Sequence, residues 1–330
     1  MRGFGKGKRN GASERSRATL IFFATDIHGS DLCFKKFLNA GKFYGATHLI
    51  VGGDITGKSL VPIRQSGERW TAHFANRDHI LTTRQELDGL VKAIRDDGQY
   101  PLVAEQDELD ALADESHRAK VFTSLVVEGM RRWMDLADER LEGTGISCYV
   151  TPGNDDFWEL DPVIEAARTV QYVEGGCVRI DDRHEMVTTG YSNITPWRTE
   201  RELTEEDLGA RLESLWEQVT DPSNVVAVIH VPPLGTGLDV APELTADLSL
   251  KATTGGLTMT HVGSSAVRSW IERHQPLCGL FGHVHESKAA ESLGRTICLN
   301  PGSEYTSGVL AGALLALGDG RVNSYQFVTG

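Results

Sequence analysis

Residues 19–28, TLIFFATDIH, decide the fold class of this 330-residue chain. An apolar run at 20–24 is short and continuous, and a carboxylate and an imidazole follow it at Asp26 and His28. A short apolar run that ends in polar residues is typical of a strand buried on both faces of a sheet. The stretch therefore predicts an α/β core with chemically active side chains at the carboxyl end of its first strand.

The same texture recurs along the chain. Further short apolar runs occupy residues 49–51, 147–150, 225–229 and 279–281. Between the first two runs, apolar residues recur at roughly helical spacing over 32–43, so strand, helix and strand follow one another and the sheet is expected to begin parallel. After residue 285, turn signals separate the remaining apolar runs, which predicts a closing antiparallel meander.

Two segments depart from this strand pattern. Residues 1–18 are rich in Gly, Ser, Arg and Lys without periodicity, which predicts a disordered basic tail before a main domain at 19–330. Residues from about 57 to 145 carry helical patterns, such as the i, i+3, i+4, i+7 apolar spacing over 84–95. Because this segment separates two motif-bearing strand ends, we expect a helical cap inserted near the site. The alternative is a peripheral cap that only lengthens a loop.

Composition and charge limit the class of function. Hydrophobic residues make up 40% of the chain and charged residues 24%, close to the averages for soluble globular proteins. The net charge of -13 provides no general attraction to nucleic acid. Five cysteines, an odd number without a CxxC pair, are typical of a reducing compartment. No apolar run approaches the roughly 20 residues of a membrane-spanning helix, so we expect a cytoplasmic protein without a membrane partner.

The basic start and the apolar run at 20–24 superficially resemble a signal peptide. The apolar run is too short for one, lacks a small-residue cleavage site and leads directly into polar motif residues. We therefore expect the run to stay in the protein as a strand.

Five short polar motifs occur in order, each directly after an apolar run. Strand ends of this kind converge on one crevice in an open α/β sheet. Each motif is weak alone, since a lone histidine after a strand is more often a satisfied core residue than a ligand. A single geometry explains all of them together. The motifs are Asp26-Ile27-His28, Gly52-Gly53-Asp54, Gly153-Asn154-Asp155-Asp156, His230 and Gly282-His283-Val284-His285.

The motif residues suit a pair of divalent metal ions. Two cations roughly 3.5–4 Å apart need one oxygen ligand that bridges them and separate terminal ligands. Asp54 is the candidate bridge, and Asn154 offers a neutral amide oxygen. Mixed imidazole and carboxylate ligands favour Mn, Fe, Zn, Co or Ni over Ca or Mg, and we expect manganese. The expected ligands are Asp26, His28, Asp54, Asn154, His230, His283 and His285.

On these motifs, together with the sequence His230-Val231-Pro232-Pro233, the chain from about residue 19 onward resembles the calcineurin-like metallophosphoesterase superfamily. Its motif set is most similar to the Icc-related branch of predicted phosphoesterases. The resemblance implies a four-layer αββα sandwich of two mixed β-sheets. It also implies that one metal is bound by Asp26, His28, Asp54 and His285, and the other by Asp54, Asn154, His230 and His283.

The chain departs from the superfamily pattern at Asp155. Many members have a histidine at this position, where it contacts the phosphate and protonates the leaving oxygen. A carboxylate cannot neutralise phosphate unless it is protonated or linked to a metal. Asp155 is therefore either a catalytic group of different character, beside Asp54 and Asn154, or a residue that only caps the turn.

The sequence predicts a metal-dependent phosphoric ester hydrolase, in which a hydroxide shared by two cations attacks phosphorus in line. The expected substrate is a small phosphoester, with a diester favoured over a monoester because no histidine acid is evident. The alternatives are a non-catalytic metal-binding scaffold of the same fold and a nuclease of the same superfamily. Suitable residues at every ligand position disfavour the first, and the acidic balance disfavours the second. The sequence leaves open whether the chain forms an oligomer through the helical insertion.

Three further side chains have two interpretations each. Trp197 and Arg198 follow an apolar run and could line the crevice, where they would stack on a base and contact a phosphate. Alternatively, Trp197 lies in the core and Arg198 in a surface ion pair. Lys58 is equally open between a substrate contact and a solvated surface position.

Overall fold

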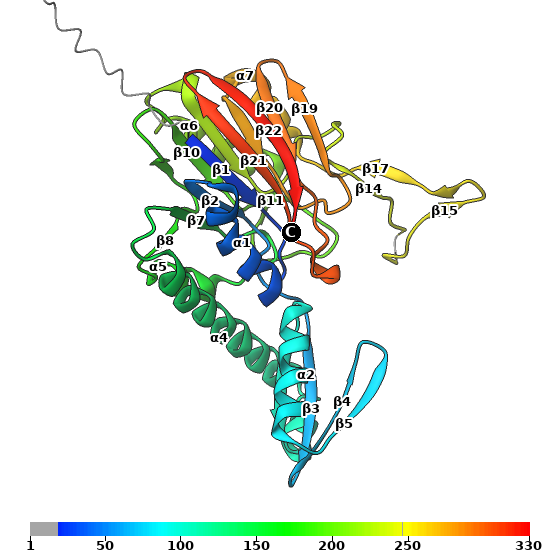
Figure 1. Ribbon diagram of the computed structural model, residues 1–330. Helices are drawn as coiled ribbons and strands as arrows, with labels where there is room; N and C mark the ends of the chain where they lie inside the picture. The colour runs from blue at the N-terminus through cyan, green and yellow to red at the C-terminus, as the bar shows by residue number, and fades with distance from the viewer. Residues whose placement is uncertain (1–18, 246) are drawn as a thin grey trace, which may run out of the picture.

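Two mixed β-sheets of six strands each form the centre of the protein, as the computed structural model of residues 19–245 and 247–330 shows (Figure 1). The expected disordered tail at 1–18 lies outside these described residues. The first sheet has the order β22 (Arg321–Thr329), β21 (Ala311–Gly318), β1 (Thr19–Ala24), β2 (His48–Gly52), β7 (Ser147–Thr151) and β8 (Val170–Tyr172). The second has the order β19 (Ala289–Leu293), β20 (Thr296–Asn300), β18 (Cys278–Leu280), β13 (Val225–Ile229), β10 (Glu185–Thr189) and β9 (Cys177–Arg179).

The central strands of each sheet run parallel, which places their carboxyl ends at one edge. In the first sheet β1 pairs with β2, and β2 with β7, all parallel. In the second sheet β10, β13, β18 and β20 pair in parallel. The strands after residue 285 form two antiparallel pairs, β19–β20 and β21–β22, that belong to different sheets. The expected closing meander is therefore two separate hairpins, since the chain crosses between sheets after β20.

Three hydrophobic layers hold the sheets and helices together. Phe22 on β1 faces α1 (Asp31–Tyr44), α4 (Glu115–Leu141) and α5 (Asp161–Glu165), while the next residue, Phe23, faces the second sheet. Val226 on β13 packs against Phe23 in the layer between the sheets, and Val225 packs outward under α6 (Glu205–Trp216) and α7 (Ser265–His274). This alternation of neighbours is the two-residue period of a strand buried on both faces. The expected α/β sandwich of two mixed sheets is confirmed.

Helix α1 follows the first motif directly and begins where the sequence provides a cap. The Ser30 side chain accepts a hydrogen bond from the Cys33 backbone N–H at the N-terminus. Gly45 ends the helix with a left-handed φ of 69°. On the buried face, Phe34 stacks on Trp133 of α4 with ring centroids 4.3 Å apart. The helix that follows the first motif loop is thus defined at both ends and packed on α4.

The insertion at 57–145 contains strands as well as helices. Its elements are β3 (Leu60–Ser66), β4 (Arg69–Phe74), β5 (Arg77–Leu81), α2 (Arg84–Asp96), β6 (Tyr100–Ala104), α3 (Gln106–Ala111) and α4. The four strands form a sheet of order β5-β4-β3-β6. Val61 and Ile63 are buried against Leu87 and Ile94 of α2, whereas Pro62 between them is exposed. The helical pattern of α2 was predicted correctly, but the insertion is mixed rather than helical, because charged residues on the solvent face obscured the strand alternation.

The insertion extends from the end of the sandwich at which the motif strands finish, and a second extension leaves the second sheet (Figure 1). That second extension is a β-arm built from β14 (Val240–Pro242) and β17 (Met259–His261), with β15 (Ala252–Thr253) and β16 (Gly256–Leu257) toward its tip. The remaining elements are β11 (Ser192–Asn193), β12 (Glu202–Leu203) and three short 3₁₀ turns at Trp158–Leu160, Pro222–Asn224 and Tyr305–Ser307. Within residues 19–245 and 247–330, no helix has the length and apolar character of a bilayer span.

Candidate metal centre

Loops from both sheets meet at the carboxyl ends of β1, β2, β7, β13 and β18. The backbone N–H of Asp26 donates to Gly53 O at 3.0 Å, which ties the first motif loop to the second. The backbone N–H of His283 donates to the Asp26 carboxylate, 3.0 Å from Oδ2, and so joins the two sheets. All seven expected metal ligands lie in this cluster: Asp26, His28, Asp54, Asn154, His230, His283 and His285.

Strained backbone is concentrated in these loops. Among the described residues, nine that are not glycine have positive φ, and four of them are candidate ligands. The four are Asp26 (φ 53°), His28 (φ 38°), Asp54 (φ 48°) and His283 (φ 67°). Left-handed backbone at a residue with a side chain costs free energy and persists where the surroundings determine it, commonly at functional sites. Gly53 beside them needs to be glycine, because a Cβ there would lie 2.3 Å from His230 Nδ1.

The first group of side chains contains Asp26, His28 and His285. His285 Nε2 lies 3.3 Å from Asp26 Oδ1 and 3.0 Å from His28 Nε2. His28 Nε2 is also 4.0 Å from Asp26 Oδ1 and 3.9 Å from Asp54 Oδ2. The three ligand atoms lie within 4.8 Å of one another, so one cation could contact all of them.

The second group contains Asp54, His230 and His283. His230 Nε2 lies 3.2 Å from Asp54 Oδ1, and His283 Nδ1 lies 2.8 Å from the amide oxygen of Asn154. Asp54 therefore presents one carboxylate oxygen toward His230 and the other toward His28 of the first group. This is the position that a ligand bridging two cations requires.

The orientation of two buried histidines shows that the groups fit cations. His28 Nδ1 faces Thr56 O at 3.2 Å, and His230 Nδ1 faces Gly52 O at 2.9 Å. Because a carbonyl oxygen only accepts, each Nδ1 carries the proton, and in the neutral imidazole Nε2 presents its lone pair to the centre of the cluster. His230 Nε2 is buried and makes no hydrogen bond within the described residues. After loss of its proton, this atom would aim a lone pair between the carboxylates, which is a typical metal-ligand arrangement.

Charges in the cluster shift the pKa values strongly. Burial raises the pKa of Asp26, but hydrogen bonding to His285 and the charges of His230 and His285 lower it further, to about 2. Burial lowers the pKa of His28 and of His283 to about 4, so both imidazoles are neutral at pH 7. For His230 burial acts in the same direction, but the adjacent Asp54 carboxylate outweighs it and raises the pKa to about 10. The anionic Asp26 carboxylate and the neutral imidazoles of His28 and His283 are therefore already in the protonation states that bind metal, whereas His230 must first lose a proton.

Asp155 lies at the edge of the cluster and makes specific contacts. Its backbone N–H donates to Asp54 Oδ1 at 3.1 Å, and its carboxylate accepts from the Asn154 amide at 3.1 Å and forms an ion pair with Lys58. Together with His28 and Asp54, it is a third group that could hold a cation. Burial and then the charge of Asp54 raise the pKa of Asp155, while Lys58 opposes that rise. Asp155 therefore makes contacts beyond its own turn, and Lys58 lies beside the site.

Asp156, which the sequence interpretation left without a role of its own, holds two motif loops together. Its carboxylate is fully buried and accepts from the backbone N–H groups of Ile55 (3.0 Å), Thr56 (2.9 Å) and Gly153 (2.7 Å), and from the Thr56 hydroxyl (2.6 Å). These donors follow Asp54 in one loop and precede Asn154 in the other. The only signal in the sequence is a second aspartate after the Asn-Asp pair, which does not reveal its partners.

The segment around Trp197 adjoins Asn154. The Asn154 amide N–H donates to Thr199 Oγ1 at 2.8 Å, which leaves its oxygen free to face the cluster. Trp197 is 62% exposed, so its placement in the core is excluded. Arg198 is exposed with φ 54°, and its side chain has no ion pair or hydrogen bond within the described part of the chain, which removes the surface-pair alternative. Trp197 and Arg198 precede Thr199, which contacts the candidate ligand Asn154, by two positions and one position in the chain.

Comparisons with known proteins provide a fold but no established activity. No family model matches the chain. The uncharacterized protein MJ1162 of Methanocaldococcus jannaschii is 31% identical over 153 residues, which are 46% of this chain. This matched region spans 61% of the length of that relative.

Solved structures align over nearly the whole chain. TT1561 of Thermus thermophilus aligns over 95% of this chain and 98% of its own, with 13% identity and a TM-score of 0.54. Another crystal structure covers the same shares at 15% identity with a TM-score of 0.56. YfcE, a phosphoesterase from E. coli, aligns over 93% of this chain and 98% of its own with a TM-score of 0.32, which is too low to support an argument. At these identities the first two likenesses show a shared fold alone.

Proposed function

We propose that the protein is a phosphoesterase of the calcineurin-like metallophosphoesterase type that works with two divalent metal ions, with manganese as the expected metal. The observation that carries the proposal is the pair of buried imidazoles, His28 and His230. Each is fixed by a backbone carbonyl at Nδ1 and faces the Asp54 carboxylate with Nε2. Metal-binding histidines are commonly oriented in this way by a partner at the other ring nitrogen.

Each side chain has a distinct task in this proposal. Asp54 would be the ligand that the two ions share. Asp26, His28 and His285 would complete one ion's ligands, and Asn154, His230 and His283 the other's. When bound, such a pair of cations supplies an activated water and binds the phosphoryl oxygens. The protein keeps His28 and His230 buried, so the geometry does not depend on mobile surface groups.

The Lys58–Asp155 ion pair supplies charge where many superfamily members carry a histidine. Asp155 holds the Lys58 ammonium beside Asp54, close to the position at which a substrate phosphoryl group would bind. A cation there stabilises negative charge as it develops on the phosphoester. Since Lys58 is 56% exposed, it can adjust to a substrate. We propose a small phosphodiester as the preferred substrate, with Trp197 and Arg198 as candidate contacts for its organic part.

Metal analysis and hydrolysis of two model esters test the proposed function. Protein purified without chelator should contain two divalent ions per chain and should hydrolyse bis-(p-nitrophenyl) phosphate with added Mn²⁺ faster than p-nitrophenyl phosphate. Asp54→Ala should lose both the second ion and the hydrolysis, because the two Asp54 oxygens face different groups, one 3.2 Å from His230 Nε2 and the other 3.9 Å from His28 Nε2. Asp88→Ala, an exposed carboxylate on α2, is the matched control and should change neither.

Three results would count against the proposal. Retention of two ions and near-normal turnover in Asp54→Ala would exclude the bridging assignment. Bound metal without hydrolysis of either ester would favour the non-catalytic scaffold, and tight duplex-DNA binding at low salt would favour the nuclease.

A further inference from the structure

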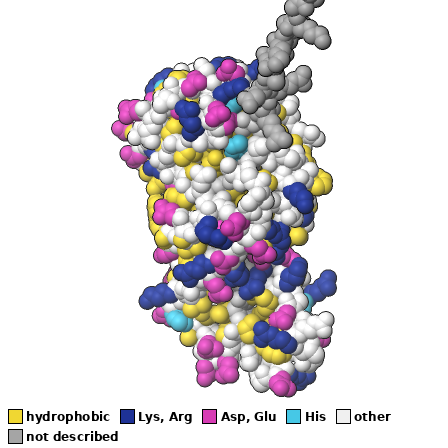
Figure 2. All heavy atoms as spheres, turned by 60° about the vertical axis from the view of Figure 1, so that its left-hand side comes forward, with side chains coloured by type: hydrophobic (Ala, Val, Ile, Leu, Met, Phe, Trp, Pro, Cys, Tyr) yellow, Lys and Arg dark blue, Asp and Glu magenta, His cyan; other side chains and the backbone are white. Residues whose placement is uncertain are grey.

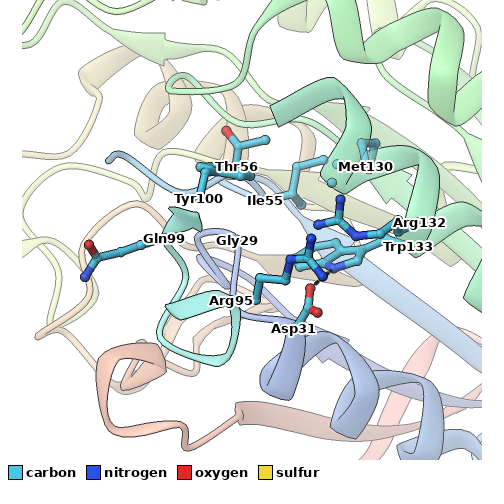
Figure 3. Close-up of a pocket in the computed structure, with 11 residues that line it drawn as sticks. Gly29, Asp31, Ile55, Thr56, Arg95, Gln99, Tyr100, Met130, Arg132 and Trp133 are labelled. Atoms are coloured by element: carbon cyan, nitrogen blue, oxygen red, sulfur yellow. Dashed lines mark hydrogen bonds between the residues drawn. The ribbon is translucent and has the colours of Figure 1, made fainter. Parts of the chain in front are cut away.

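A small cleft that opens to solvent lies at the junction of the insertion and the core (Figure 3). We call it the junction cleft. Its lining comes from α1, α2 and α4 and from the two loops that carry the first metal motifs. None of the seven candidate metal ligands lines it, but Gly29 and Ile55 do, and these residues directly follow His28 and Asp54. The junction cleft is thus separate from the candidate metal centre and adjoins its loops.

Two arginines from different helices face each other in this cleft. Arg95 from the last turn of α2 and Arg132 from α4 bring their guanidinium groups together above Asp31, as Figure 3 shows. Asp31 is the one carboxylate among the lining residues. Its oxygens are already engaged, with Oδ1 accepting from Trp133 Nε1 at 2.7 Å and Oδ2 lying 3.6 Å from Lys35 Nζ. The single carboxylate of Asp31 cannot balance two guanidinium groups, so the lining of the cleft carries excess positive charge. The protein as a whole has a net charge of -13.

Arg95 lacks an acceptor of its own. Its Nε is buried without a hydrogen-bond partner, and its guanidinium forms no ion pair within the described residues. Burial and then the charge of Arg132 lower the pKa of Arg95, and the charges of Asp31 and Glu128 oppose that shift only in part. Among the described residues, Arg132 forms a single ion pair, with Glu128 one turn earlier in the same helix. Arg132 Nη1 and Glu128 Oε1 are 3.3 Å apart. A buried N–H donor without an acceptor destabilises a fold, as does a pair of like charges.

We infer that the junction cleft binds a phosphate-type oxyanion between Arg95 and Arg132. The planar fork of a guanidinium matches the spacing of phosphate oxygens, and two forks on one anion form several charge-assisted hydrogen bonds. The anion would provide the acceptor that Arg95 Nε lacks and would offset the repulsion between the two arginines. It would also connect α2 with α4 across the cleft.

The surface around the junction is compatible with the entry of an anion. Lys and Arg side chains are interspersed with Asp and Glu over the middle of the face in Figure 2, without a continuous acidic patch there. Gln99, an uncharged lining side chain, donates to Asp97 at 2.7 Å. The arginine pair therefore dominates the local charge.

Phosphate binding to the full-length, chelator-treated protein tests this inference independently of the proposed function. Isothermal titration with inorganic phosphate should show binding in the wild type. Arg95→Met and Arg132→Met, which keep the apolar stem, should each weaken it roughly tenfold to a hundredfold, as expected for loss of hydrogen bonds to a charged group. Arg131→Met removes an exposed charge from the same helix and should leave the affinity unchanged.

The melting temperature separates an anion site from a structural role. Without phosphate, Arg95→Met should melt at or above the wild-type temperature, because it removes one of two like charges. Phosphate should then stabilise the wild type and Arg131→Met but not Arg95→Met. Absence of phosphate binding in the wild type would overturn the inference. So would wild-type affinity in Arg95→Met and Arg132→Met, since the anion would then bind elsewhere, for example at the metal-free histidine cluster.

Discussion

The Nε2 atoms of His28 and His285 lie 3.0 Å apart, although the two residues follow strands of different sheets. His28 donates from Nδ1 to Thr56 O, so its Nε2 offers a lone pair to the space shared with His285. Asp26 Oδ1 is 3.3 Å from His285 Nε2 and completes the group. Three potential ligand atoms therefore surround one position, which depends on the packing of one sheet against the other.

The two ligand groups should titrate as two sites. His28→Ala or His285→Ala should weaken mainly one Mn²⁺-binding step, and His230→Ala or His283→Ala the other, by more than the roughly 10–100-fold that loss of an outer partner costs. Calorimetric titration of chelator-treated protein should resolve the two affinities. His261→Ala, a histidine paired with Asp239 outside the cluster, is the control. Unchanged binding in all four ligand variants would remove the two-site arrangement.

Metal binding should release a proton from His230. The pKa of His230 in the metal-free protein is raised to about 10, so the imidazole is protonated at pH 8 and must lose its proton to bind metal. The affinity of this site should therefore rise with pH up to about 10. For folding, the raised pKa stabilises the metal-free protein fully below pH 6.5, and this contribution disappears as the pH rises to about 10.

Calorimetry in buffers of different ionisation enthalpy measures that proton. At pH 8 the wild type should release about one proton more per chain than His230→Ala on binding Mn²⁺. His28 and His283 should contribute none, because their pKa values are lowered to about 4 and both are already neutral. Equal proton release from the wild type and His230→Ala would contradict the protonated state of His230.

Asp156→Ala should weaken metal binding although Asp156 contacts no metal. The substitution leaves four donors from two loops without their acceptor, which should lower the free energy of unfolding by about 3 kcal/mol. It should also lower Mn²⁺ affinity, because Asp54 and Asn154 are no longer held in register. Burial and the Asp54 charge raise the pKa of Asp156 to about 6. Asp156→Asn, which removes the charge but keeps the size of the side chain, should therefore be measured beside Asp156→Ala. Loss of stability with unchanged metal affinity would limit Asp156 to a structural role.

Asp155 and Lys58 should act on turnover rather than on metal content. Asp155→His brings a donor to the leaving oxygen and should raise the monoester-to-diester ratio of kcat/KM. If Asp155 were the acid, Asp155→Asn should lose the roughly 10²–10⁴-fold of positioned proton transfer. Because Asp155 is paired with Lys58, we expect a smaller loss, and a comparable loss in Lys58→Met that Lys58→Arg restores. Unchanged rates in Asp155→His, Asp155→Asn and Lys58→Met would exclude a chemical role for the pair.

Much of the fold follows from local patterns in the sequence. Continuous apolar runs predicted the buried parallel strands β1, β2, β7, β13 and β18, since strands covered on both faces need no polar alternation. The apolar spacing over 84–95 predicted α2. The sheet of the insertion was missed, because its strands are half exposed and rich in Arg and His. Local patterns are most informative where burial is complete.

In the candidate site, too, some features follow from the sequence and others from the tertiary structure. The sequence determined which residues stand at strand ends, because position after a buried strand is a local property. Only the tertiary structure decided that Asp155 pairs with Lys58, that Asp156 joins two loops and that Arg95 faces Arg132. These contacts join residues up to 101 positions apart in the sequence, or on different helices. No periodicity encodes such contacts, since they depend on how sheets and helices pack together.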